Sequence, residues 1–174
     1  MTATPYVAVV GAAQATPALV TAAQAVGRDL ALAGAVLLTG GHGGVMAAAC
    51  RGAASAGGVT VGILPGADRA GANEWVAVAI PTGLGELRNG LIVRAADVVI
   101  AVGGAYGTLS EVALALSTGV PVVGLGTWSI DGIEPVDSPQ RAVARALELV
   151  REVGAIAGQE GATKLRPGGG GRQA

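Results

Sequence analysis

The sequence of 174 residues contains no phenylalanine and only one cysteine, one histidine and one lysine. A single Cys50 cannot form an internal disulfide, and its position in a run of small residues favours a buried, inert thiol. No other ligand lies at metal-binding spacing from His42, so we expect no metal site. Because the only lysine is Lys164, the sequence lacks a Walker-type phosphate loop and an internal Schiff-base lysine for pyridoxal phosphate.

Charge is scarce as well, since only 13% of the residues are charged and the net charge is −1. Without a dense Lys/Arg run, neither nucleic acid nor an anionic membrane is an expected partner. Globular proteins average roughly 25% charged residues, so the low value predicts that another subunit covers part of the surface, in a homodimer or larger homo-oligomer. The first residues lack a basic signal region and the apolar runs are too short to span a membrane, which predicts a cytoplasmic protein.

Small residues are abundant instead. The sequence has 36 alanines and 30 glycines, so 66 of its 174 side chains are no larger than a methyl group. A core made of such residues must bring backbone segments close together, because there is little side-chain volume to separate them.

Short β-branched runs alternate with longer alanine-rich segments, which predicts an α/β protein. We expect a three-layer Rossmann-like fold with a mainly parallel sheet and helices on both faces, formed by residues 1–154, with a disordered tail at 155–174. The expected strands are Tyr6–Val10, Ala35–Thr39, Val59–Leu64, Trp75–Ile80, Val98–Val102 and Pro121–Leu125. The expected helices are Ala18–Ala33, Val45–Ala56, Glu86–Ala96, Leu109–Ser117 and Gln140–Val153.

Glycine-rich loops follow three of the expected strands, at residues 11–13, 40–44 and 103–108. Open parallel sheets bind ligands at the carboxyl ends of their strands, beside a topological switch point. Glycines there let a phosphate approach the amide groups that begin the next helix. The same glycines are also expected in tight strand-to-helix turns that bind nothing. The loops match neither the dinucleotide fingerprint nor the Walker motif, so we predict a small phosphorylated ligand of another class.

Three segments together resemble a known family. They are Gly40-Gly41-His42-Gly43-Gly44-Val45-Met46, Leu87-Arg88-Asn89 and Gly103-Gly104-Ala105-Tyr106-Gly107-Thr108-Leu109-Ser110-Glu111. These resemble the signatures of the LOG (Lonely Guy) superfamily, over Tyr6 to about Val150. The asparagine after Arg88 and the glycine at position 103 are closer to the branch that resembles molybdenum-cofactor carrier proteins. The missing internal lysine argues against the lysine decarboxylase label that members of this superfamily once carried.

The resemblance implies a function and a set of site residues. LOG enzymes hydrolyse the N-glycosidic bond of nucleoside 5′-monophosphates, and their catalytic arginine and glutamate fall on Arg88 and Glu111. A carboxylate beneath the ribose would stabilise an oxocarbenium-like transition state, and this hydrolysis requires no cofactor. The expected ligand-binding residues are Gly11, Gly40, Gly41, Gly44, Met46, Asn89, Gly103, Gly104, Gly107 and Thr108.

Two alternatives remain open from the sequence. The protein either hydrolyses a nucleoside monophosphate or binds a nucleotide or a pterin phosphate, such as the molybdenum cofactor, without catalysis. Ala105 and Ser110 depart from the Pro-Gly-Gly and Glu-Glu of the family motif, which weakens the case for hydrolysis. For Glu111, the structural alternative is a capping box in which Thr108 is the N-cap residue and Glu111 folds back onto it.

Overall fold

The structure, a computed structural model, describes the backbone of residues 4–163 and the side chains of residues 4–155. Its strands are β1 (Tyr6–Gly11), β2 (Val36–Thr39), β3 (Thr60–Leu64), β4 (Val78–Pro81), β5 (Val98–Val102), β6 (Val122–Leu125) and β7 (Ile133–Val136). Its helices are α1 (Pro17–Leu32), α2 (Val45–Ser55), the short 3-10 helix η1 (Gly85–Arg88), α3 (Asn89–Ala95), α4 (Tyr106–Ser117) and α5 (Pro139–Thr163).

The seven strands form one sheet in the order β4-β3-β2-β1-β5-β6-β7, and every neighbouring pair is parallel. The chain leaves β1 toward β2 on one side and returns to β5 on the other. The topological switch point therefore lies between β1 and β5, where Gly11 is paired with Val102 at the carboxyl ends of both strands. This confirms the predicted α/β fold.

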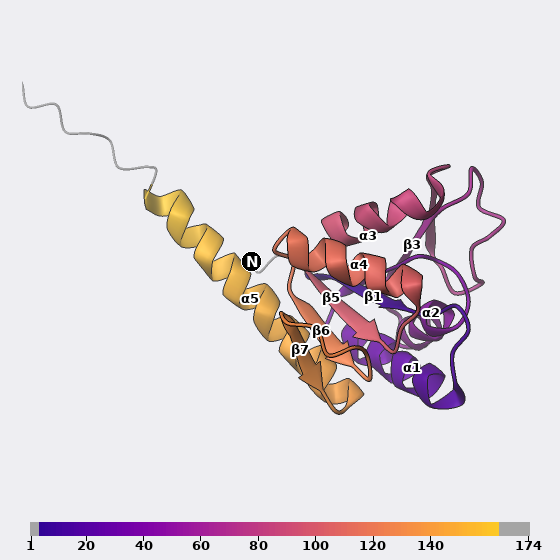
Figure 1. The fold of residues 1–174 in the computed structure, drawn as a ribbon, viewed down its shortest axis with the longest axis horizontal. Coiled ribbons are helices and arrows are strands. Elements are labelled where there is room, and N and C mark those ends of the chain that lie inside the picture. Colours follow the sequence, from indigo (N-terminus) through magenta and orange to yellow (C-terminus); the bar gives the residue numbers. More distant parts are fainter. Residues whose placement is uncertain (1–3, 164–174) are drawn as a thin grey trace, which may run out of the picture.

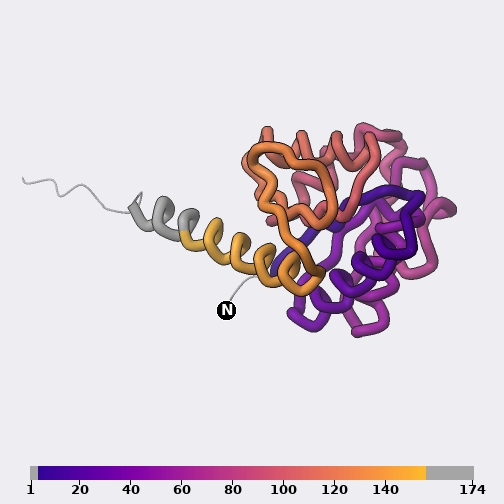
Figure 2. The backbone as a smooth tube through the Cα atoms, turned by 60° about the horizontal axis from the view of Figure 1, so that its bottom comes forward, coloured from indigo at the N-terminus to yellow at the C-terminus, as the bar shows by residue number. Residues whose placement is uncertain are grey.

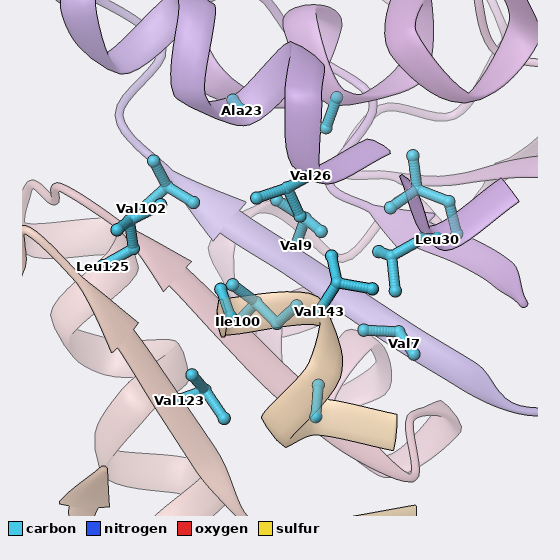
Figure 3. Packing of buried hydrophobic residues seen from close by; sticks show 14 of the residues in the cluster. Val7, Val9, Ala23, Val26, Leu30, Ile100, Val102, Val123, Leu125 and Val143 are labelled. Carbon is cyan, nitrogen blue, oxygen red and sulfur yellow. The ribbon is translucent and has the colours of Figure 1, made fainter. Parts of the chain in front are cut away.

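Helices cover both faces of the sheet, as Figure 1 shows. On one face α1, α2 and α5 contribute Ala23, Val26, Leu30, Ala49 and Val143 to a core with Val7, Val9 and Ile100 of the sheet. Figure 3 shows Val143 of α5 and Val26 of α1 over these strands. On the other face α3 and α4 bury Ile92, Val93, Val112 and Ala115. The result is the expected three-layer arrangement.

The first layer depends on direct backbone contact between α1 and α2. A Cβ added at Gly27 would lie 1.9 Å from the carbonyl oxygen of Ala49, and one at Gly52 would lie 2.0 Å from that of Gln24. Real Cβ atoms do not come so close, so only glycine fits at either position. The alanine- and glycine-rich composition thus packs backbone against backbone, as expected from the sequence.

Several predicted boundaries are wrong. The strand expected at 75–80 is β4 at Val78–Pro81, and the helix expected at 86–96 is divided into η1 and α3. Strand β7 is missing from the sequence prediction; it lies at the edge of the sheet, where Pro135 is tolerated.

The C-terminal helix also runs further than predicted. Gly154 does not end the fold: α5 passes through it and continues to Thr163, away from the layers (Figure 1). Figure 2 shows the earlier part of α5 already leaving the layers. Residues 155–163 of the expected tail are therefore helical, and the remainder, 164–174, lies outside the described residues. Among the helices described between residues 4 and 163, none combines the length and apolar character that a membrane span requires.

Candidate functional site

A cavity of about 300 Å³ lies at the switch point. The loop after β1 forms one wall, the beginning of α2 and the loop before it form another, and η1 and the first turns of α4 complete it. The lining residues are Gly11, Ala12, Ala13, His42, Met46, Glu86, Arg88, Asn89, Ala105, Gly107, Thr108 and Glu111. The segments that carry the three sequence motifs therefore meet around one space.

The twelve predicted site residues divide into two groups. Seven line the cavity: Gly11, Met46, Arg88, Asn89, Gly107, Thr108 and Glu111. The other five, Gly40, Gly41, Gly44, Gly103 and Gly104, are absent from its lining. These five instead allow close packing behind the wall, since an added Cβ would clash with Arg88, Leu64, Ala12, Leu19 and Trp128, respectively.

Glycine at position 40 makes room for Arg88. A Cβ there would lie 2.7 Å from Nη2 of Arg88, which donates a hydrogen bond of 3.4 Å to the Gly40 carbonyl. Nη1 of Arg88 donates to the side chain of Asn89, and Nε is buried without an acceptor. The Arg88 side chain is only 5% exposed. A guanidinium with unused donor capacity is thus held in the cavity wall.

The carboxylate of Glu111 lies next to this guanidinium, with Nη1 of Arg88 3.8 Å from its Oε1. The Glu111 side chain is 8% exposed. Burial raises the pKa of Glu111 to about 7, because the positive charge of Arg88 offsets only part of the desolvation and Glu86 adds a negative charge nearby. Burial lowers the pKa of Arg88 in turn, while Glu111 and Glu86 oppose that shift. A carboxyl group with a pKa of about 7 next to a guanidinium suits this wall to bind charged or polar ligand atoms.

Two helices begin at the cavity without a side-chain cap. Gly44 precedes α2 and Ala105 precedes α4, and neither supplies a side-chain hydrogen bond to its helix. By contrast, Oγ1 of Thr16 accepts a hydrogen bond from the Leu19 amide at the beginning of α1, which does not line the cavity. The Val45 amide at the beginning of α2 donates to the Ala12 carbonyl at 3.1 Å. The other first amides of such helices carry partial positive charge and need acceptors. A ligand anion at the cavity would provide them.

The capping-box interpretation of Glu111 is wrong. Helix α4 begins at Tyr106 with Ala105 as its N-cap residue, so Thr108 is already inside the helix. Glu111 is therefore one turn deeper than a capping residue, and its side chain lines the cavity. Ser110 does have a structural role: its hydroxyl accepts a hydrogen bond of 2.9 Å from Asn89 and donates one of 2.7 Å to the Gly107 carbonyl.

Sequence reasoning did not select Glu86 or Ala105 as site residues, although both line the cavity. Glu86 precedes Arg88 by two residues in η1. The methyl group of Ala105 stands where the family motif has glycine. His42 also lines the cavity, and its loop is fixed by Asn73, whose Nδ2 donates to the carbonyls of Gly41 and His42 at 3.0 and 2.9 Å.

Comparison with known proteins identifies the family. The model of the SLOG cluster4 family matches residues 4–154. The chain belongs to the SLOG cluster4 family. The LOG label inferred from the three motifs is a coarser fit to the same group of proteins.

Several known proteins are similar to this SLOG chain over most of its length. The molybdenum cofactor binding protein of Rippkaea orientalis is 38% identical, with a TM-score of 0.79 over 88% of this chain and 99% of that one. The Moco carrier protein of Chlamydomonas reinhardtii is 34% identical, with a TM-score of 0.79 over 86% of this chain and 99% of that one. An uncharacterized protein of Archaeoglobus fulgidus is 40% identical over 79% of this chain and 91% of its own.

Proposed function

We propose that this SLOG protein binds a small phosphorylated heterocycle, a pterin or a nucleotide, in the cavity at the switch point, and does so without catalysis. The observation that carries the proposal is that α2 and α4 both begin without a side-chain cap at a cavity whose wall holds a buried arginine. The volume of about 300 Å³ is at the lower end of the range for small-molecule sites, which suits a ligand of this size. The relatives that bind or carry the molybdenum cofactor, itself a pterin phosphate, support the same interpretation.

The phosphate group should dominate affinity. We expect GMP, AMP and the monophosphate of 6-hydroxymethylpterin each to bind at least about tenfold more tightly than the same compound without phosphate, because only the phosphate satisfies the amides at the beginning of α4. Titration calorimetry with the three pairs measures this. Equal affinity for the phosphorylated and dephosphorylated compounds would contradict the proposal, as would the absence of binding by all six.

Glycine at position 107 offers a matched test of the place of binding. A Cβ at Gly107 would meet no atom within 4 Å, and the same holds for Gly90 in α3, which does not line the cavity. We expect Gly107→Leu to weaken binding of these monophosphates by about tenfold or more, since its side chain fills space beside the first turn of α4. Gly90→Leu should keep the wild-type affinity. Equal affinities for the two variants would place the ligand elsewhere.

Hydrolysis of nucleoside monophosphates is the second candidate, because Arg88 and Glu111 do lie together in the cavity. Two residues argue against hydrolysis. The methyl group of Ala105 narrows the space through which a ligand approaches the backbone, and Ser110 stands where the family motif has a second glutamate. We therefore expect wild-type protein incubated with AMP to release no more adenine, measured by chromatography, than Glu111→Gln. Release of adenine by wild type alone would favour hydrolysis.

The expected self-association is also a proposal. Leu87 and Tyr106, whose neighbours in the chain line the cavity, are 82% and 90% exposed. Large apolar side chains this exposed are common where a second subunit packs. Sedimentation equilibrium at micromolar concentration should show a dimer or a larger assembly, and a clean monomer would refute the proposal.

A further inference from the structure

Glu111 is a buried acceptor without a donor. Within the part of the chain whose side chains are described, nothing donates a hydrogen bond to its carboxylate, and the nearest cation, Nη1 of Arg88, is 3.8 Å away. Burying a carboxylate without hydrogen bonds is costly. Such a group is retained where something outside the chain supplies the donors. Because Glu111 lines the cavity, these donors would come from the ligand.

The guanidinium of Arg88 beside it is a donor without enough acceptors. Its Nη atoms donate to Asn89 and to the Gly40 carbonyl, but its Nε is buried and has no partner. The cavity wall therefore presents two carboxylate oxygens and, directly beside them, a guanidinium. Together the two side chains bring carboxylate acceptors and guanidinium donors to the same part of the wall.

We propose that Glu111 and Arg88 recognise the 2-amino-4-oxopyrimidine edge of a fused bicyclic ring, the edge that pterins and guanine share. This inference rests on the proposed function and names the ligand class of the same cavity. The edge presents an exocyclic amine, a ring N–H and a carbonyl oxygen in that order, so it offers two donors to a carboxylate and an acceptor to the guanidinium next to it. Glu111 accepts from the amine and the ring N–H, and Arg88 donates to the carbonyl oxygen.

The positions along α4 fit a ligand with a ring at one end and a phosphate at the other. Gly107 lies in the first turn, where the uncapped amides are, and Glu111 is four residues further on. Four residues of α-helix span about 6 Å along the axis. The anionic group and the ring edge can therefore contact the same helix at two separate points.

The same geometry disfavours other rings. Hypoxanthine keeps the ring N–H and the carbonyl but lacks the amine, so one oxygen of Glu111 stays without a donor. Adenine places a ring nitrogen acceptor against the carboxylate. A site built to hydrogen-bond a polar group strongly rejects an analogue that lacks this group. We therefore expect a preference of at least about tenfold for GMP over IMP.

A pH dependence of that preference is a second signature. GMP presents two N–H donors, and both can bind Glu111 when its carboxyl group is ionised. Burial raises the pKa of this carboxyl group to about 7. The preference for GMP over IMP should therefore increase from pH 6 to pH 8. Arg88 and Glu86 from η1 and His42 from the loop before α2 also face the cavity. Because GMP and IMP carry the same phosphate and meet these groups alike, the ratio of their affinities isolates Glu111.

The experiment compares two pairs of probes that differ in the amine. One pair is GMP and IMP; the other is the monophosphate of 6-hydroxymethylpterin and its lumazine counterpart, in which an oxygen replaces the amine. Dissociation constants are measured by calorimetry for wild type, Glu111→Gln and Glu74→Gln, an exposed carboxylate outside the cavity. We expect wild type and Glu74→Gln to prefer the amino compound of each pair that binds by at least about tenfold, and Glu111→Gln to lose that preference.

The outcomes separate the inference from the proposed function. If the phosphorylated probes bind, but wild type binds the compounds with and without the amine equally, the inference fails and the proposed function stands. A preference that Glu111→Gln retains also overturns the inference. If none of the four phosphorylated probes binds, both fail. A preference in the pterin pair alone, or in the guanine pair alone, supports the inference and identifies the source of the ring.

Discussion

Gly27→Ala should unfold at a much lower urea concentration than wild type. The added methyl carbon would lie 1.9 Å from the carbonyl oxygen of Ala49, so α1 and α2 have to move apart. The atom in the way belongs to a helix backbone, which cannot rotate aside as a side chain can. Overpacking of this kind costs roughly 1–3 kcal/mol and occasionally more, and the rigidity of this contact favours about 3 kcal/mol.

Gly90→Ala is the control for this substitution. Gly90 also lies in a helix, α3, but a Cβ there would meet no atom within 4 Å. Alanine is favoured over glycine in a helix by roughly 0.5–1 kcal/mol, so this variant should be slightly more stable than wild type. Urea unfolding of the three proteins measures both effects. If Gly27→Ala were as stable as Gly90→Ala, the α1–α2 contact would not be the rigid element described above.

The sequence predicts that backbone segments pack closely, but it does not predict which glycines make the contact. A chain in which 66 of 174 residues are alanine or glycine can form a core only from closely spaced backbones. Which glycines make the contact depends on how α1 crosses α2. Nothing near Gly27 or Gly52 in the sequence distinguishes them from Gly90, because the partner of each is some twenty residues or more away along the chain.

The sequence also predicts which loops form the site, but not where Glu111 lies in its helix. The strand-to-helix loops after β1, β2 and β5 were expected at one edge of the sheet, and the strand order places the first and third of them on either side of the switch point. The position of Glu111 was ambiguous, because Thr108-Leu109-Ser110-Glu111 is equally a capping box or the second turn of a helix that begins earlier. Turn geometry at Gly103 and Ala105 decides between them, and local spacing does not determine that geometry.

Two differences between the predicted and the observed site depend on the fold. Glu86 lies outside the three motifs from which the site residues are predicted, and the structure places it in the 3-10 turn η1 before α3 begins. Gly104 was expected to contact phosphate, yet the ring of Trp128 lies where its Cβ would be. Trp128 follows β6, more than twenty residues later, so only the folded chain brings this ring onto the loop.

Glu111→Gln should stabilise the protein at pH 8 by up to about 3 kcal/mol. The pKa of Glu111 rises from 4.5 to about 7 on folding, because burial penalises the charged form more than Arg88 favours it. Between these two values the folded state holds a proton that the unfolded state has lost. Wild-type stability therefore falls as pH rises from about 4.5 to 7 and stays low above 7. Glutamine cannot ionise, so it resembles the protonated acid at every pH.

The difference between the two unfolding free energies, measured with urea at pH 4, 5, 6, 7 and 8, isolates this carboxyl group. Other groups titrate in both proteins and cancel; Glu134 is one, since its hydrogen bond with Arg145 lowers its pKa. Glu74→Gln removes the same charge from an exposed position and should follow the wild-type profile. A difference independent of pH would show that Glu111 does not titrate in this range. A difference that grows up to pH 7 would mean that the fold gives up stability to keep an ionisable carboxyl group in the cavity, which a purely structural residue would not require.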